Sequence, residues 1–364
     1  MNKKNIIQFT PYYPPHVWGL ENVVLWIHNN WTFGTSTVVT GDMWQVDYDE
    51  DIILLPSYEL IPNFPVPLFW KIVFWKSLHS LLKKDNISWE TIIITHTRFF
   101  LMSLVWKICS KIYWYKHIHI EHWSDYVKLS SRITSFIAFM YDKTFWWFTL
   151  SRTYKTLCIS KASLEFTKNT LKGKRVQVWK RWFDIDNDIL KDTTQVHFVY
   201  IGRLVSLKGC DTLLHAYAKT RLANKLYIIW DGEERDNLQV LCEDLWITKK
   251  VIFMWFLKNQ DVRSFLKSKN NIVINPSYQE WMPTTVIEAL ATNNIVVASN
   301  VWGTTEISQL WDLILFEAWN IKQLSDQMKY SQEKFTRLQG LSFFHIKQNF
   351  SWEKSIVDLY NCMK

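Results

Sequence analysis

The chain has 364 residues, a hydrophobic fraction of 48% and a formal net charge of +8. This length is too great for one ordinary domain and fits two domains of about 150 to 200 residues each. No apolar run reaches the roughly 18 residues that cross a bilayer, and the short apolar stretch after Lys4 is typical of a first strand and not of a signal peptide. The five cysteines form no CxxC pair, which suits a reducing cytoplasm without structural zinc. We therefore expect a cytoplasmic protein.

Short β-branched segments alternate with stretches of helical pattern along the chain, which predicts an α/β fold. The alternation restarts after a polar, acidic segment at residues 184–194, which we interpret as a linker between two domains with parallel sheets. We place the domains at residues 1–185 and 186–345, and we expect residues 346–364 to form a C-terminal helix that returns to the first domain. Strands are expected at residues 6–9, 37–39, 92–95, 117–121 and 156–159, and again at residues 196–201, 225–229, 251–254, 272–275 and 295–299.

The positive charge is concentrated in the first half of the chain. Residues 1–184 hold 22 Lys and Arg against 14 Asp and Glu, whereas residues 185–364 hold 20 of each kind. Residues 98–181 alone carry 16 basic and 4 acidic side chains. A surface of one sign attracts anionic lipid headgroups, polyanions or phosphate-bearing substrates, although a basic surface without any partner remains an open alternative. Nucleic acid is not expected as a partner, because the sequence has no helix-turn-helix, RNP or zinc-finger pattern.

Tryptophan and glycine occur in unusual proportions. The chain has 22 Trp and 9 Gly, whereas a globular protein of this length has roughly 25 glycines. Four tryptophans, Trp18, Trp230, Trp281 and Trp302, occupy positions where an expected strand turns into a helix or a ligand loop. Such turns favour positive φ or a bare backbone. We hypothesise that most Trp codons are UGA triplets that the source organism reads as glycine, with Trp352 a genuine tryptophan. Indoles at positions 18, 281 and 302 should otherwise crowd or strain the backbone.

The strongest chemical pattern is the segment 276–289, which follows a buried strand and opens a helix. Ligands of parallel sheets settle at the carboxyl ends of strands, where a helix start offers N–H groups to an anion. The residues placed to meet a phosphate are Met282, Pro283, Thr284 and Thr285. Two carboxylates, Glu280 in the loop and Glu288 about one turn into the helix, are spaced to bind hydroxyl groups at different points of one ligand.

A second pattern, residues 202–209, follows the first strand of the second domain. Its cations, Arg203 and Lys208, are suited to neutralise a departing diphosphate, one as a planar fork and one as a point charge. Gly202 opens this loop. A metal ion is then unnecessary, and the DxD pattern of Asp184 and Asp186 in an acidic linker is too short to indicate one. Near the N-terminus, the loop that ends in Trp18 and Gly19 would form a third phosphate-binding turn if residue 18 were glycine.

Together these motifs resemble the family 4 retaining glycosyltransferases of GT-B fold, in which two Rossmann-like domains face each other across a cleft. The resemblance is detailed over residues 198–306 and looser over residues 6–21, 92–129 and 350–354. Four motifs depart from the family pattern by the same change of Gly to Trp, which supports recoding over a different family. The matching residues are Trp18 with Gly19, 202–209, Trp230 to Glu234, Glu280 with Glu288, and Trp302 to Glu306.

The resemblance implies a role for each of these residues. Arg203 and Lys208 would hold the donor diphosphate, Glu288 the ribose hydroxyls and Glu280 the donor sugar. His122 matches a histidine that reaches the donor sugar from the N-terminal domain, whereas His96 follows a strand and is expected to be structural. The first domain would bind the acceptor and the second the nucleotide sugar, which is a co-substrate, so no cofactor is expected.

The implied reaction is the retaining transfer of a hexose-type sugar from a nucleotide diphosphate sugar to a glycan or lipid-linked acceptor, in the synthesis of cell-surface polysaccharide or glycolipid. The basic stretch and the aromatic segment 136–148 favour an acceptor at an anionic membrane surface, with the protein peripheral on the inner face of the cytoplasmic membrane. Three alternatives stay open. These are an NAD-dependent oxidoreductase, disfavoured by the absence of GxGxxG; a GT-B sugar-nucleotide epimerase; and a non-catalytic scaffold if the tryptophans are literal.

Overall fold

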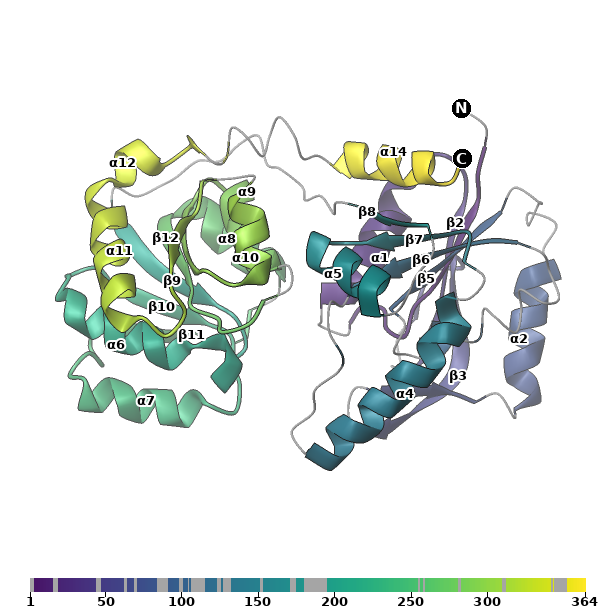
Figure 1. Cartoon of the computed structure of the whole chain (residues 1–364), viewed down its shortest axis with the longest axis horizontal. Helices are drawn as coiled ribbons and strands as arrows, with labels where there is room; N and C mark the ends of the chain where they lie inside the picture. The colour runs from purple at the N-terminus through teal and green to yellow at the C-terminus, as the bar shows by residue number, and fades with distance from the viewer. Residues whose placement is uncertain are drawn as a thin grey trace. The chain divides into compact units, whose positions relative to one another are not determined.

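Two separate sheets organise the chain (Figure 1). The first unit comprises Met1–Arg181 and Trp352–Lys364, and the second comprises Trp182–Ser351. The expected boundary between residues 185 and 186 lies outside the described residues. This computed structural model describes residues 3–15, 19–43, 47–61, 64–68, 71–83, 91–97, 101–103, 105, 115–122, 126, 132–150, 153–170, 175–179, 195–254, 256–257, 259–280, 283–309, 312–341, 343 and 352–364.

The first unit holds an eight-stranded sheet in the order β4-β3-β2-β1-β5-β6-β7-β8. All neighbouring strands are parallel except β3 and β4, which are antiparallel. The central strands are buried along their whole length, which accounts for their runs of isoleucine and valine. The strands are β1 (Ile6–Phe9), β2 (Ser36–Asp42), β3 (Ile52–Ile61), β4 (Phe64–Pro67), β5 (Ile92–His96), β6 (Lys116–Glu121), β7 (Lys155–Cys158) and β8 (Val176–Val178), and the helices are α1 (Gly19–Asn30), α2 (Ile72–Lys83), α4 (Arg132–Leu150), α5 (Lys161–Glu165), η1 (Phe166–Thr170) and α14 (Trp352–Cys362).

The second unit holds a six-stranded, fully parallel sheet in the order β11-β10-β9-β12-β13-β14. Its strands are β9 (Val196–Ile201), β10 (Leu226–Ile229), β11 (Val251–Met254), β12 (Asn270–Asn275), β13 (Ile295–Ser299) and β14 (Ile314–Phe316). Its helices are η2 (Ser206–Lys208), α6 (Cys210–Thr220), α7 (Arg235–Asp244), α8 (Asn259–Ser268), α9 (Thr284–Ala291), α10 (Trp302–Ser308), α11 (Ile321–Glu333) and α12 (Phe335–Leu338).

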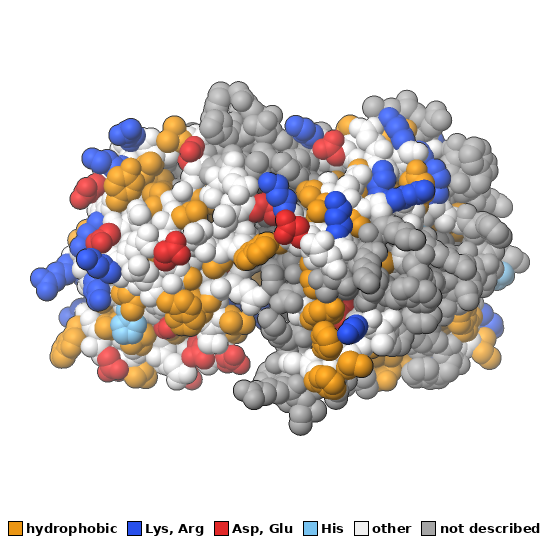
Figure 2. All heavy atoms as spheres, viewed as in Figure 1, with side chains coloured by type: hydrophobic (Ala, Val, Ile, Leu, Met, Phe, Trp, Pro, Cys, Tyr) orange, Lys and Arg blue, Asp and Glu red, His pale blue; other side chains and the backbone are white. Residues whose placement is uncertain are grey.

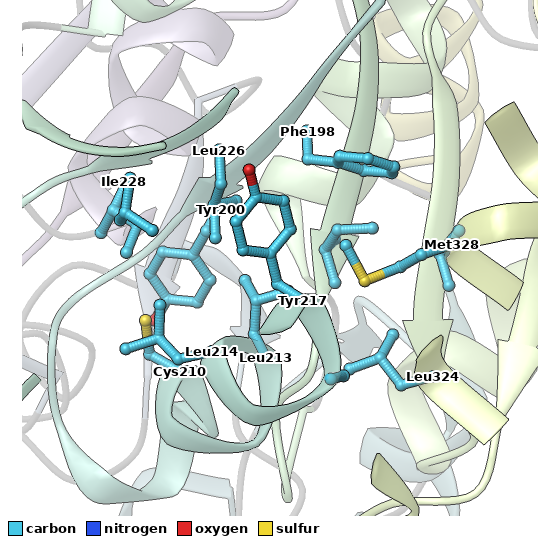
Figure 3. Packing of buried hydrophobic residues seen from close by; sticks show 14 of the residues in the cluster. Phe198, Tyr200, Cys210, Leu213, Leu214, Tyr217, Leu226, Ile228, Leu324 and Met328 are labelled. Atoms are coloured by element: carbon cyan, nitrogen blue, oxygen red, sulfur yellow. The ribbon is translucent and has the colours of Figure 1, made fainter. Parts of the chain in front are cut away.

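The core of the second unit lies between its sheet and the helices α6 and α11 (Figure 3). Phe198 and Tyr200 of β9 meet Tyr217 of α6, and Met328 of α11 closes the same cluster. All four side chains are at most 2% exposed. Burial on this scale stabilises the unit by roughly 1.5 to 3 kcal/mol for each large side chain and fixes the strand ends on which loops are mounted.

In both sheets, successive strands are added first toward one edge of the sheet and then toward the other edge, so the strand order reverses at one point. The reversal lies between β1 and β5 in the first unit and between β9 and β12 in the second. In open parallel sheets, ligands bind outside the carboxyl ends of the strands at such a point. Residues that follow β9 and β12 are therefore in the expected position for a ligand site.

All ten strands expected from the sequence are confirmed, and the structure adds β3, β4, β8 and β14. β3 was not predicted because Pro56 interrupts its pattern. Its pairing with β2 ends at Pro56, and its pairing with β4 begins at Ser57. Proline has no N–H to donate to a neighbouring strand, so Pro56 suits the position at which β3 stops pairing with β2 and starts pairing with β4. β8 and β14 have three residues each, too few to show a period.

The C-terminal helix α14 is part of the first unit. The indole N–H of Trp179 donates to the carbonyl of Ser355 at 3.2 Å, and Lys4 Nζ donates to the carbonyl of Met363 at 3.3 Å. The ring of Tyr360 lies 4.2 Å from that of Phe33. Contacts from three distant parts of the chain thus hold the C-terminal segment. Among the described helices, none is both long and apolar enough to cross a bilayer.

Candidate active site

Glu280 lies in the loop after β12 and is 8% exposed. Its Oε1 accepts hydrogen bonds from Lys208 Nζ at 2.6 Å, from Ser277 Oγ at 2.7 Å and from Asn275 Nδ2 at 3.5 Å. The side chains of Lys208 and Glu280 are 26% and 10% exposed. The two motifs that the sequence singled out separately therefore meet at one carboxylate, as a mostly buried ion pair.

The loops that carry this pair are locked together by their backbones. Tyr278 N–H donates to the carbonyl of Leu207 at 2.9 Å. Gly209 has a φ of +63°, and a Cβ at this position would lie 2.2 Å from the carbonyl oxygen of Pro276. Only glycine permits both this backbone and this approach. Gly209 is thus what allows Lys208 to reach Glu280.

Tyr278 adds a side-chain link between the same loops. Its hydroxyl donates to Asp211 Oδ1 at 2.9 Å and lies 2.8 Å from Thr212 Oγ1, both at the start of α6. Burial raises the pKa of Tyr278 to about 12, so the hydroxyl keeps its proton and its role as a donor at neutral pH.

The main chain of the Glu280 loop is also held by residues of β13 and α10. Gly303 N–H, in the first turn of α10, donates to the Glu280 carbonyl at 3.0 Å, and Ser299 Oγ donates to the carbonyl of Ser277. Bonds from two sides fix the loop, which preorganises the carboxylate for a ligand. Ser277 and Asn275 were not expected as site residues. The sequence signal for them was position alone, since Asn275 ends the buried strand β12 and Ser277 lies between that strand and Glu280.

Helix α9 begins directly beyond this loop. Pro283 is its N-cap residue, and Thr284 and Thr285 occupy the first turn, half-buried. N–H groups in a first helical turn have no partner within the helix and favour an anion. Glu288 is half-buried on the same helix, one turn from its start. Met282 lies outside the described residues.

The cations of the 202–209 loop differ in their surroundings. Lys208 pairs with Glu280, whereas Arg203 is exposed, and its carbonyl accepts from the Tyr200 hydroxyl and from Val205 N–H, each at 3.0 Å. Gly202 is half-buried, and a Cβ there would lie 3.2 Å from the same hydroxyl. Within the part of the chain that the structure describes, Lys208 and not Arg203 is brought to the carboxylate.

The loop after β10 packs against the same segment. Leu204 N–H donates to the carbonyl of Asp231 at 3.0 Å, and a Cβ on Gly232 would lie 2.4 Å from the Leu204 carbonyl oxygen. Trp230, which precedes these residues, has a φ of +120°. The motif at 230–234 therefore supports the loop that carries Arg203 and Lys208.

Two of the expected site residues of the first unit are described. Gly19 is the first residue of α1, and His122 directly follows β6, where it is 9% exposed. His122 Nε2 lies 3.2 Å from Nδ1 of His96. Trp18 lies outside the described residues.

Metal ligands were not expected, and Asp184 and Asp186 of the DxD pattern lie outside the described residues. Among the residues that are described, no three His, Cys, Asp or Glu side chains are grouped closely enough to hold a metal ion.

Residues 183–333 match the model of the family Glycosyl transferases group 1. Over this stretch the chain is similar to the glycosyltransferases of group 1. It contains Lys208, Glu280 and Glu288, so the geometry described above lies within the matched region.

Relatives extend the similarity to the rest of the chain. An uncharacterized glycosyltransferase of Methanocaldococcus jannaschii is 25% identical, over 98% of this chain and 97% of its own length. The lipopolysaccharide core biosynthesis glycosyltransferase LpsE of Rhizobium meliloti is 34% identical over 28% of this chain and 29% of its own. These relatives support glycosyltransferase activity for the chain.

Solved structures identify the fold of the glycosyltransferase. A glycosyltransferase from Rickettsia africae matches with a TM-score of 0.76 and 17% identity, over 100% of this chain and 98% of its own. HepE of Anabaena in complex with UDP and glucose matches with a TM-score of 0.72 and 14% identity, over 99% of each chain. The expected GT-B fold with two Rossmann-like domains is confirmed.

Proposed function

We propose that the chain is a retaining glycosyltransferase that moves a hexose-type sugar from a nucleotide diphosphate sugar to a glycan or lipid-linked acceptor. The observation that carries this proposal is the Lys208–Glu280 ion pair beside the N-terminus of α9. A cation for a diphosphate, a carboxylate for hydroxyl groups and a helix start for a phosphate are the parts that such a donor requires.

In this proposal the bond between the anomeric carbon and the diphosphate breaks while the acceptor oxygen bonds to the same face of the sugar. The diphosphate leaves with the electron pair of the broken bond, and the acceptor hydroxyl passes its proton to the departing phosphate oxygen. Lys208 and Arg203 stabilise the leaving charge, Glu280 binds sugar hydroxyls, Glu288 binds the ribose, and no metal takes part. His122 contributes from the first unit by contact with the donor sugar. Most of the rate comes from electrostatic stabilisation.

The ion pair lowers the desolvation cost of binding the donor. Lys208 and Glu280 neutralise each other at 2.6 Å, so neither leaves an unpaired charge in a mostly buried place. A donor offers a phosphate to the lysine and hydroxyl groups to the carboxylate, and so replaces one set of charge-assisted hydrogen bonds with another. The site binds such a ligand at little desolvation cost.

A turnover assay tests the proposed function. UDP-glucose is the first donor to try, because a solved structure of HepE contains UDP-glucose. Release of the nucleotide diphosphate should depend on an added acceptor, and NMR of the product should give the same anomeric configuration as the donor. An inverted product, or release of free sugar alone with every donor tested, would overturn the proposal.

The acceptor and the localisation are part of the same proposal. We infer that the protein acts in the cytoplasm at an anionic membrane surface, through helix α4. Phe136 and Met140, one turn apart on that helix, are 62% and 44% exposed, and Lys143 is exposed on the turn that follows. Apolar side chains beside a cation suit the interface of an anionic bilayer. Figure 2 shows basic and acidic side chains interspersed on the visible face of the second unit, and residues 185–364 hold 20 basic and 20 acidic side chains.

Replacing Phe136 and Met140 together with aspartate is expected to lower retention on phosphatidylglycerol vesicles about tenfold at low salt, because apolar contact is removed and like charge is added. Cosedimentation measures the bound fraction. The matched control is Val240→Asp, since Val240 is 57% exposed on α7 of the second unit and should leave retention unchanged. Equal retention of the double variant and the wild type would contradict the assignment to α4.

We also propose that several tryptophans stand for glycine in the natural protein. Seven described residues other than glycine have positive φ, and three of them are Trp230, Trp246 and Trp319. Trp makes up 22 of 364 residues, so chance would place fewer than one among seven. Trp246 is 93% exposed, and the Trp319 ring lies 3.3 Å from that of Tyr278, closer than the roughly 4.5 to 7 Å usual for aromatic pairs.

Other tryptophans carry no such signature. Trp302 is the first residue of α10 and is not among the described residues with positive φ, so the strained backbone expected there is not found. Trp31 and Trp179 are buried, and each donates its indole N–H to a backbone carbonyl. The proposal is strongest for Trp230, where sequence context and backbone agree.

The gene sequence decides the recoding proposal. UGA codons are expected at positions 230, 246 and 319 and at positions 18 and 281, which lie outside the described residues, and a UGG codon is expected at Trp352. UGG at the three positive-φ positions would end the idea, and the conformation of the chain would then need another explanation.

A further inference from the structure

A chain of three buried side chains crosses the point of strand reversal in the first unit. Gln8 belongs to β1, His96 ends the neighbouring strand β5, and His122 follows β6. His96 Nε2 lies 3.1 Å from Gln8 Oε1, and His96 Nδ1 lies 3.2 Å from His122 Nε2. Gln8 and His96 are fully buried. Both nitrogens of one imidazole are therefore engaged, one by an amide and the other by a second imidazole.

The direction of these hydrogen bonds follows from the orientation of the Gln8 amide. Gln8 Nε2 donates to the carbonyl of Val24 at 3.2 Å, a group that can only accept. This bond orients the amide and turns its oxygen, Oε1, toward His96. Because an amide oxygen only accepts, the proton of His96 is on Nε2. In the neutral ring Nδ1 then carries the lone pair and must accept from its neighbour, His122.

His96 stays neutral in this position. Complete burial lowers its pKa well below the usual range, and the nearby His122 and His119 lower the pKa further. Of the two neutral tautomers of His96, only the one with its proton on Nε2 can donate to Gln8 and accept from His122.

We propose that Gln8 and His96 are positioning residues that hold His122 in the tautomer with the proton on Nε2. The Nδ1 atom of a neutral His122 is then a hydrogen-bond acceptor. Any contact that it makes with a ligand is with a donor group such as a sugar hydroxyl, and a phosphate oxygen is excluded. The sugar contact rests on the proposed function, whereas the tautomer does not.

This arrangement also accounts for polar side chains at a buried sheet position. An amide and an imidazole in the interior cost free energy unless each polar atom is paired. Hydrophobic residues would serve packing alone at lower cost. The three-residue chain instead transmits a fixed orientation from the carbonyl of Val24 to an imidazole at the carboxyl end of a strand, where ligands bind.

The test is the ring-nitrogen NMR spectrum of protein labelled with ¹⁵N-histidine, without any donor present. Wild-type His122 is expected to have the shifts of the Nε2–H tautomer, with its signals assigned by their loss in His122→Asn. Gln8→Met keeps the volume and removes the acceptor, so His96 no longer has to carry its proton on Nε2. His122 should then lose its tautomer preference.

Thr95→Val is the matched control. Thr95 lies on the same strand as His96, and its hydroxyl is hydrogen-bonded to two other buried histidines, His117 at 2.7 Å and His119 at 2.8 Å. This variant should leave the His122 tautomer unchanged. Turnover should fall about fivefold in Gln8→Met, as expected for one misdirected hydrogen bond of about 1 kcal/mol, and by less than about twofold in Thr95→Val.

Two results would overturn the proposal. One is a wild-type His122 with its proton on Nδ1, and the other is an unchanged His122 tautomer in folded Gln8→Met. If Gln8→Met does not fold, the wild-type spectrum alone decides. The spectrum requires no substrate, so the expected tautomer in a protein that transfers no sugar would count against the proposed function and not against this inference.

Discussion

Replacing Trp230, Trp246 and Trp319 together with glycine is expected to raise the free energy of unfolding of the second unit by about 1 to 3 kcal/mol. A left-handed backbone costs an L-residue about 1 to 2 kcal/mol, and glycine avoids this cost. Against this gain stands the greater freedom of glycine in the unfolded chain, about 0.5 to 1 kcal/mol for each position. Glycine also removes the ring packing of Trp230 on Phe256, which reduces the net gain further.

Trp302→Gly is the matched control for this experiment. Trp302 is 66% exposed in a helical first turn, so glycine relieves no strain there and should leave stability unchanged or slightly lower it. Thermal unfolding followed by circular dichroism compares the two, with a shift of about 2 to 4 °C expected for each kcal/mol in a unit of this size. A triple variant that melts below the wild type would show that the indoles stabilise the fold.

Lys208→Ala is expected to lower donor turnover at least tenfold. The lysine is the cation that the structure holds next to Glu280, and a charge-assisted hydrogen bond to a leaving phosphate is worth about 1.5 to 3 kcal/mol. Each 1.36 kcal/mol of lost stabilisation is about a tenfold loss in rate. Glu288→Ala should cause a loss of the same order. Steady-state release of the nucleotide diphosphate measures both.

Two further variants separate catalysis from folding. Lys219→Ala removes an exposed lysine from the last turn of α6 and should keep turnover within about twofold of the wild type. Because Lys208→Ala leaves Glu280 without its cation, the melting temperature of Lys208→Ala must be compared with that of Lys208→Ala combined with Glu280→Gln. Near wild-type turnover in a folded Lys208→Ala protein would refute the role given to the lysine.

The strands were predictable because the buried β-branched runs of a parallel sheet stand out against polar loops. The same holds for the loop after β12, since a helix start behind a buried strand is visible in the order of residues. β3 was missed because Pro56 hides its change of partner. Fold class thus follows from patterns of a few residues.

The connections within the sites were not predictable in the same way. Lys208 and Glu280 are 72 residues apart, and Gln8 and His96 are 88 apart. Each residue was visible in the sequence as one of suitable chemistry, but both pairings depend on side-chain rotamers. The pairing of Lys208 with Glu280 depends also on the close approach of Gly209 to Pro276. His96 was expected to be structural, and only the bonds on both sides of its ring indicate a further role.

The placement of α14 has a consequence for how the chain comes apart. The polypeptide passes between the units twice, once after Arg181 and once before Trp352. A protease that cuts the chain only after Arg181 leaves an N-terminal and a C-terminal fragment. The C-terminal fragment ends in α14, which remains packed against the N-terminal fragment. The nicked protein should therefore run as one species under native conditions and as two bands after denaturation, and release of the units requires both cuts.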